Sequence, residues 1–292
     1  MLADAIRSET YRFTRNRMAV FWSILFVPVL FLAIGTAVQF FTKARMAEMA
    51  EALPPELTAE GGPLAASGPL DLGQGLLAQA GDFANPIVML FVLIGAAIIY
   101  AGDYRWETWR LTSARNSRTN LILGKVALVF VIVLAAFVTW MAFGLVGEVI
   151  KAAVFARPLG FDLGAERPAQ LAGLTAVTIA RVMQFTMFGL LTAVVTRSLL
   201  ATLFVPVVVA IGQTLLMQGL PLLGWSAGDL QAHLLIPGLS HDLLKTLLEG
   251  GPDAAAAPEG AAWKAITGLT VWTVVPLAGA LAWFSRQDLS KE

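Results

Sequence analysis

The chain has no cysteine among its 292 residues, and only 14% of its residues are charged. The lack of cysteine excludes disulfide bonds, thiolate metal sites and cysteine nucleophiles. The low charge excludes an ordinary soluble domain, in which about a quarter of the residues are charged. Hydrophobic residues make up 57% of the chain, and the mean hydropathy is +0.73. Since these residues fall in runs of roughly 20, the composition predicts an all-α integral membrane protein.

Six membrane-spanning helices are expected, in a single transmembrane domain over residues 1–292. A basic amphipathic segment with four arginines precedes the first span and predicts an interfacial helix over residues 1–17. No small-x-small cleavage site closely follows the first span, which is therefore expected to remain as an anchor. The expected spans are residues 18–41, 86–102, 120–149, 177–196, 198–219 and 264–285, and the helix of the fourth span could begin earlier, near Ala169.

The segments between the spans are expected to alternate between the two sides of the membrane. An inner loop covers residues 103–119, and the last outer loop is unusually apolar, with two short helices predicted on either side of Pro237-Gly238. Cations concentrate in the N-terminal segment and the inner loop, so the positive-inside rule places both termini in the cytoplasm. The expected location is the plasma (inner) membrane. The outer loops are residues 42–85, 150–176 and 220–263.

Few chemistry-bearing side chains fall inside the expected spans. By these boundaries no Asp, Glu or His lies in a span interior, which argues against a proton-coupled carrier. Arg181 is the one arginine inside an expected span, and its long side chain is expected to snorkel to water at the outer interface. Gln39, Gln184 and Gln213 could line a substrate path, or they could form hydrogen bonds between helices.

Recognisable catalytic and ligand-binding motifs are incomplete. Gly124-Lys125 lacks the earlier glycine and the following Ser or Thr of a phosphate loop, so the chain should bind no nucleotide. His233 and His241 could bind a metal with a neighbouring aspartate, but a third ligand is lacking and an interfacial role is expected instead. No nucleophile, base and orienting group cluster together, so we expect no catalytic residue and no cofactor.

Residues 100–125 form the most strongly patterned polar segment of the chain. Five cations oppose two acids there, between two very apolar runs. The pattern predicts a short helix over residues 103–116. Asp103 can cap this helix, which would have one charged face and one aromatic face. The aromatic face needs a partner surface, which could be lipid headgroups, the rest of the chain or another protein. The positions on these faces are Asp103, Glu107 and Arg110, and Trp106 and Trp109.

This segment resembles the corresponding segment of ABC-2 type permeases, the membrane subunits of ATP-binding-cassette exporters. The family pattern is an acid, an aromatic and a basic residue, Gly-Thr, a basic residue, Ser-Arg, and Gly-Lys opening the third span. Asp103 replaces the commoner Glu, and Glu107 stands where Gly is usual. The amphipathic N-terminus, six spans, a tight turn at Arg197 and the apolar last outer loop support the resemblance. The matching residues are Asp103, Tyr104-Arg105, Thr108, Arg110, Ser117-Arg118 and Gly124-Lys125.

The resemblance implies that residues 103–116 form a coupling helix docked on a separate ATPase subunit. It also implies pairing with a second permease copy or a homologous permease, with the substrate route between them. Membrane lipid is the other expected partner, and no nucleic acid is expected. The alternatives are a non-transporting scaffold or sensor of the same fold, and a loop that merely lies on lipid headgroups. The implied ATPase-coupling residues are Asp103, Tyr104, Arg105, Trp106, Glu107, Thr108, Trp109 and Arg110.

Overall fold

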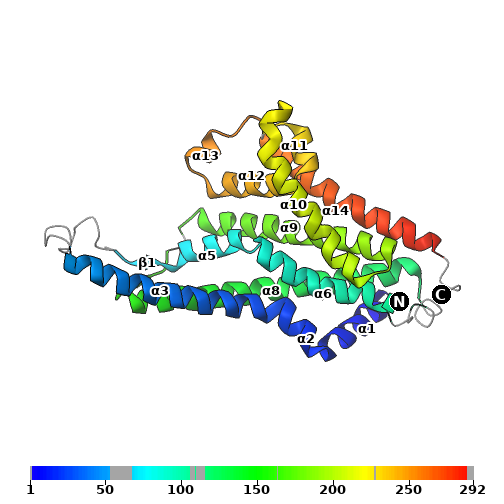
Figure 1. Cartoon of the computed structure of the whole chain (residues 1–292), viewed down its shortest axis with the longest axis horizontal. Coiled ribbons are helices and arrows are strands. Elements are labelled where there is room, and N and C mark those ends of the chain that lie inside the picture. Colours follow the sequence, from blue (N-terminus) through cyan, green and yellow to red (C-terminus); the bar gives the residue numbers. More distant parts are fainter. Residues whose placement is uncertain are drawn as a thin grey trace.

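Six helices among the described residues are long and apolar enough to cross a membrane, as expected of a multi-pass all-α membrane protein. The computed structural model describes residues 2–52, 68–105, 109, 116–162, 164–226 and 228–287. The helices run mainly along the long axis of the molecule, and α1 and the end of α14 lie at the same end (Figure 1). The spanning helices are α3 (Phe26–Ala52), α6 (Pro86–Arg105), α8 (Arg118–Val154), α9 (Arg167–Thr196), α10 (Leu199–Gly219) and α14 (Ala261–Arg286).

The N-terminal segment forms the helix that its amphipathic pattern predicts. Helix α1 (Leu2–Arg15) buries Ala5, Glu9 and Phe13, which recur every four residues along one face. It is followed by α2 (Arg17–Val20) and a π-helical turn, η1 (Phe21–Leu25), which leads directly into α3.

A π-helical turn immediately precedes Pro28 in the first span. A proline ring in a regular α-helix clashes with the carbonyl group four residues earlier, here that of Ile24. The wider π-helical turn over Phe21–Leu25 lies at this position and relieves the clash. The first span is therefore one continuous but locally widened helix, and it extends beyond the predicted end at residue 41, as far as Ala52.

The predicted starts of α6 and α10 are accurate, whereas α8 begins earlier than predicted. The Asn85 Oδ1 atom accepts hydrogen bonds from the N–H groups of Ile87 at 3.1 Å and Val88 at 3.0 Å, so α6 begins at Pro86 as expected. At the turn between α9 and α10, Arg197 adopts a left-handed conformation with φ 56°, and Ser198 caps α10. The third span begins at Arg118 instead of 120, because Ser117 caps α8.

The segments expected to be outer loops contain more structure than the sequence predicts. Helix α5 (Leu72–Asp82) lies within the expected loop 42–85 and packs against α8 and α9. Just before it, strand β1 (Leu70–Asp71) pairs in parallel with β2 (Leu159–Gly160), which joins two expected loops at the end of the molecule opposite α1 (Figure 1).

The segment between α10 and α14 divides at Pro237, as expected. Helix α11 (Leu230–Leu235) ends one residue before Ile236, and α12 (Pro237–Glu249) begins at the proline. Both pack against α14, and α12 also packs against α9. The short helices η2 (Leu220–Leu223) and α13 (Pro252–Ala255) complete this segment.

The centre of the bundle is formed by α6, α8 and α9, which are mostly buried, while few residues of α3 and α10 are buried. The exposed positions of α10 recur every three or four residues and form a continuous apolar stripe. A stripe of this kind requires lipid or another apolar surface to cover it. It comprises Leu200, Phe204, Val208, Ile211 and Leu215.

Candidate functional site

Four charged side chains from three helices meet at the end of the bundle where α1 lies. We call Glu9, Arg12, Asp103 and Lys125 the ion cluster. Lys125 is 1% exposed, and its Nζ donates to the carbonyl oxygen of Ile99 at 2.7 Å. The same Nζ lies 2.6 Å from Oδ2 of Asp103 and 3.0 Å from Oε1 of Glu9. An ammonium group has three N–H donors, so each of the three has an acceptor.

The second carboxylate oxygen of Asp103 completes the ion cluster. Its Oδ1 accepts a hydrogen bond from Nη1 of Arg12 at 2.6 Å, and Arg12 also pairs with Glu9. Two cations therefore balance two carboxylates in a place where Asp103 is only 3% exposed. Such a cluster is favourable only while its charges remain matched, because an uncompensated buried charge is strongly destabilising.

The Gly-Lys pair of the family pattern has two structural roles here. Gly124 lies where α1 crosses α8, and a Cβ atom at this position would be 2.9 Å from the Cβ of Ala5. The glycine thus allows α1 to approach closely enough for Glu9 to reach Lys125. Glu9 is an acid on an otherwise apolar helix face, which is the sequence signal for a buried basic partner.

The sequence predicted that Asp103 caps a new helix. This is wrong, because α6 continues through Asp103 to Arg105. Beyond it, Trp109 is 3% exposed and lies against this chain. Its ring centroid is 4.5 Å from that of Phe284 and 5.4 Å from that of Tyr104, and Nζ of Lys125 is 5.2 Å from the ring. Of the three partner surfaces considered for the aromatic face, Trp109 uses the rest of the chain.

The Ser117-Arg118 pair, at the start of α8, connects α8 to the end of α14. Ser117 caps α8, and Nη1 of Arg118 donates to the carbonyl oxygens of Phe284 at 3.1 Å and Ser285 at 3.0 Å. These are carbonyl groups at the C-terminal end of α14, which a helix leaves without internal partners. The predicted coupling residues Trp106, Glu107, Thr108 and Arg110 lie outside the described residues, as does the side chain of Arg105.

A cavity of about 470 Å³ borders the ion cluster. Its lining includes Glu9, Arg12, Asp103 and Lys125, together with Leu199 at the start of α10. The cluster is therefore buried against three helices but remains next to a space into which they could move.

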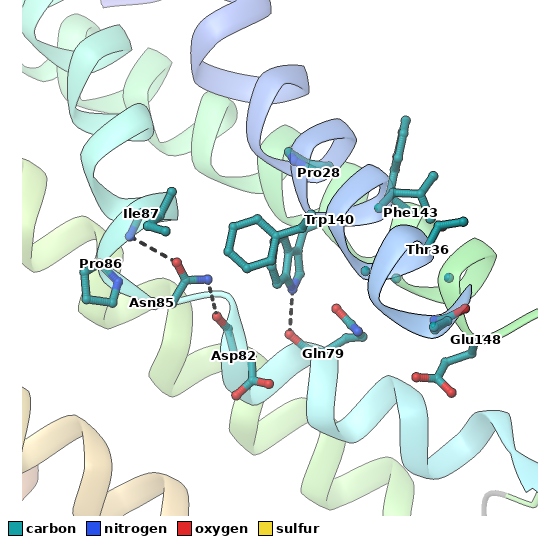
Figure 2. A pocket seen from close by; sticks show the side chains of 16 residues that line it. Pro28, Thr36, Gln79, Asp82, Asn85, Pro86, Ile87, Trp140, Phe143 and Glu148 are labelled. Atoms are coloured by element: carbon teal, nitrogen blue, oxygen red, sulfur yellow. Dashed lines mark hydrogen bonds between the residues drawn. The ribbon is translucent and has the colours of Figure 1, made fainter. Parts of the chain in front are cut away.

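Gln39 lines a second cavity of about 570 Å³ between α3, α5, the start of α6 and α8. Figure 2 shows this cavity, with the indole N–H of Trp140 directed at the carbonyl oxygen of Gln79, 2.9 Å away. Asp82 and Glu148 also border it. The Gln39 Oε1 atom is buried without a hydrogen-bond partner among the described residues.

Gln213 lines a third cavity, of about 620 Å³, between α6, α9, α10 and α12. Its Nε2 donates to the carbonyl oxygen of Leu235 at 3.0 Å, which is one of the interhelical hydrogen bonds that the sequence left open. Arg181 lines the same cavity and donates to the Oε1 atom of Gln184. Gln39 therefore lines one cavity and Gln213 another, and Gln184 lies next to the cavity of Gln213 through its contact with Arg181.

The expectation that Arg181 snorkels to water is wrong, because its residue is only 7% exposed. Helix α9 begins at Arg167, ten residues before the predicted start of the span. Arg181 consequently lies about four turns inside the helix, at 3.6 residues a turn, and not one turn inside.

The two histidines do not form a metal site with the residues around them. His233 is buried, with Nδ1 3.1 Å from Oγ of Ser240, whereas Nδ1 of His241 lies 3.0 Å from Oδ1 of Asp242. In the described part of the chain, no three His, Asp or Glu side chains gather closely enough to hold a metal ion.

The chemistry that these features support is non-covalent: charge pairing at one end of the bundle, and apolar cavities with a few polar groups on their walls. Such groups can bind a ligand or transmit a movement of helices. Comparisons of the chain with protein-family models, with curated proteins and with solved structures found no match.

Proposed function

We propose that this chain is the permease subunit of an ATP-driven exporter, and that a separate ATPase subunit docks on residues 103–116. One observation carries the proposal: the ion cluster and Arg118 fix both ends of the patterned segment to the helices of the bundle. A segment that receives a mechanical input must be rigidly connected to the parts that it moves. Here the connections lead to α1, α6, α8 and α14.

The connections lie at the start, in the middle and at the end of the segment. At its start, Asp103 is bound to α8 through Lys125 and to α1 through Arg12. In the middle, Trp109 is packed on Phe284 of α14. At its end, Arg118 binds the last carbonyl groups of α14. A displacement of the segment by a partner would therefore move α1, α8 and α14, to which the segment is bound.

In this proposal the substrate route lies between two permease copies in the plasma membrane, with both termini in the cytoplasm. The exposed apolar stripe of α10 supplies a surface for lipid or for a second copy. Gln39 and Gln213, each on the wall of a cavity, supply polar contacts for a substrate that is mainly apolar. The ATPase hydrolyses ATP, and the permease binds no nucleotide.

The orientation can be tested directly because the chain has no cysteine. A Ser113→Cys variant should react with a membrane-impermeant thiol reagent only from the cytoplasmic side, and Ser67→Cys only from the outer side. Reaction of both from the same side would contradict this arrangement.

The function is tested by photocrosslinking in native membranes. A photoreactive amino acid at position 113 should capture an ATPase subunit, identified by mass spectrometry, while the same amino acid at position 67 should not. Capture of no ATPase would refute the proposal. An ATPase that is captured, but whose hydrolysis drives no transport in reconstituted vesicles, would favour the non-transporting scaffold or sensor.

A further inference from the structure

The cavity between α6, α9, α10 and α12 combines apolar walls with one buried cation. Met89, Phe185, Val207 and Ala210 contribute apolar surface, and Arg181 contributes its guanidinium group. The volume of about 620 Å³ lies within the range of roughly 300–1,000 Å³ that is usual for small-ligand sites. An ionisable residue inside a membrane-spanning helix generally requires a partner of opposite charge.

The protein gives Arg181 little compensation. A guanidinium group has five N–H donors, and the hydrogen bond that Arg181 makes goes to the neutral amide oxygen of Gln184. The Asp242 carboxylate attracts the guanidinium, but no ion pair joins them within the described part of the chain. The side chain of Asp242 is 64% exposed and lies beside His241. Most of the donors of Arg181 are therefore available to an anion.

The N-terminus of α12 makes the same wall of the cavity favourable to a negative charge. Helix α12 has 13 residues and begins next to the guanidinium: a Cβ atom on Gly238 would lie 3.4 Å from Nη2 of Arg181. No side-chain hydrogen bond caps this helix among the described residues, and the N-terminus of a helix attracts anions.

The rim of the cavity is open on its apolar side. Ile211 and Leu215 of α10 line it and are 57% and 64% exposed. In a bilayer these side chains face the acyl chains of lipids, so a ligand with an alkyl chain can enter from within the membrane.

We propose that this cavity binds an amphiphile with one alkyl chain and an anionic head group, a carboxylate or a phosphate. The head group is held by Arg181 and the N-terminus of α12, and the alkyl chain lies along the apolar wall of α6 and α10. This inference concerns binding alone and does not depend on the exporter function.

The test uses the purified chain in nanodiscs of phosphatidylcholine, with a photoreactive palmitate whose diazirine is near the end of the alkyl chain. Labelled peptides are mapped by mass spectrometry. We expect labelling on α6 and α10 at the cavity wall, and competition by unlabelled palmitate or hexadecyl phosphate. Hexadecanol, which has the chain but no charge, should compete at least about tenfold more weakly, because it lacks a charge-assisted hydrogen bond. The two anions distinguish a carboxylate from a phosphate head group.

Four variants separate the head-group contact from the apolar contact. Arg181→Gln should reduce labelling about tenfold or more, while Arg181→Lys should retain part of it. Ala210→Phe fills the apolar part without touching the guanidinium and should also reduce labelling. Asp242→Asn removes the acid that competes for Arg181 and should increase labelling. The matched control is Arg167→Gln, an arginine on the same helix but outside the cavity, which should leave labelling unchanged.

The proposal is refuted if hexadecanol competes as well as palmitate, or if folded Arg181→Gln is labelled like the parent. Gel filtration and thermal unfolding establish whether each variant is folded. Should Arg181→Gln fail to fold, the substitutions at positions 210 and 242 decide the question. Labelling that is unchanged by both Ala210→Phe and Asp242→Asn would equally refute the proposal.

Discussion

Replacing Lys125 by methionine tests the ion cluster most directly, since methionine has a similar length and no charge. In the protein, Lys125 is 1% exposed and its Nζ lies 2.6 Å from Asp103 and 3.0 Å from Glu9. The Lys125→Met variant leaves two carboxylates opposite Arg12 alone, so the cluster carries an uncompensated negative charge. Removal of one partner from a buried ion pair costs about 3–5 kcal/mol of the free energy of unfolding.

A second substitution shows whether unmatched charge is the cause. Adding Glu9→Gln to Lys125→Met leaves Asp103 paired with Arg12, as two opposite charges 2.6 Å apart. The loss of stability in the double variant should be smaller than the sum of the two single losses, by about 1–3 kcal/mol. Additive losses would mean that the residues act independently.

The control lies at the other end of the same helix. Lys151 has a 41% exposed side chain and is 3.4 Å from Glu148. An exposed pair of this kind contributes about 1 kcal/mol or less, so Lys151→Met should be nearly neutral. The measurement is unfolding of each variant in detergent micelles by increasing SDS, followed by circular dichroism. If Lys125→Met unfolds like Lys151→Met, the cluster does not hold α1 on the bundle.

Three further outcomes are expected. The main-chain N–H of Asp162 and the guanidinium of Arg167 lower the pKa of Asp71 below its usual value. The stability that this carboxylate gives is therefore present above about pH 4 and is lost as the pH falls through the pKa of Asp71 in the folded protein. Hydrogen exchange around β1 should become faster as this stability is lost. The Asp71→Asn variant should show the fast exchange at neutral pH too. Gly124→Val should release α1, seen as proteolysis of the N-terminus, while unchanged protection would contradict the close crossing. Trp109→Ala should lower the free energy of unfolding by about 3–5 kcal/mol, and stability like the parent's would show that its burial is unimportant.

The sequence predicts the six helices because a run of about 20 apolar residues has few stable alternatives in a membrane. Helix starts were accurate where a local signal is strong, as at Asn85-Pro86 and Pro237. Arg181 was misplaced because the start of α9 was read from the apolar run at 177. The Pro168 in the first turn of α9 was the better signal, since proline is favoured there.

The features that the sequence did not predict depend on contacts between distant residues. Helix α5 contains three glycines and has weak helix propensity, and it is stabilised by packing on α8. That packing is close: a Cβ atom on Gly144 would be 2.5 Å from Cδ of Gln79. The ion cluster likewise joins Arg12 to Asp103, which are 91 residues apart. The sequence identified the patterned segment, but only the structure shows that its first acid is bound to α1 and α8.

Helix α6 connects the ion cluster to the cavity that contains Arg181. Asp103 near one end of α6 belongs to the cluster, and Met89 near the other end lines the cavity. The helix has 20 residues and is about 30 Å long at ~1.5 Å per residue, so it can transmit a tilt as a rigid element. If both proposals hold, we expect α6 to couple occupation of the cavity energetically to nucleotide binding by the ATPase.

Such coupling must be reciprocal. Palmitate should change the affinity of the assembled ATPase for nucleotide by the same factor by which nucleotide changes the affinity of the cavity for palmitate. Both affinities can be measured by titration in nanodiscs that contain the complex. Arg181→Gln should remove the effect of palmitate on nucleotide affinity, and Arg167→Gln should leave it intact. Palmitate that binds at Arg181 without changing nucleotide affinity would mean that α6 does not transmit between the two sites, although each site would still exist.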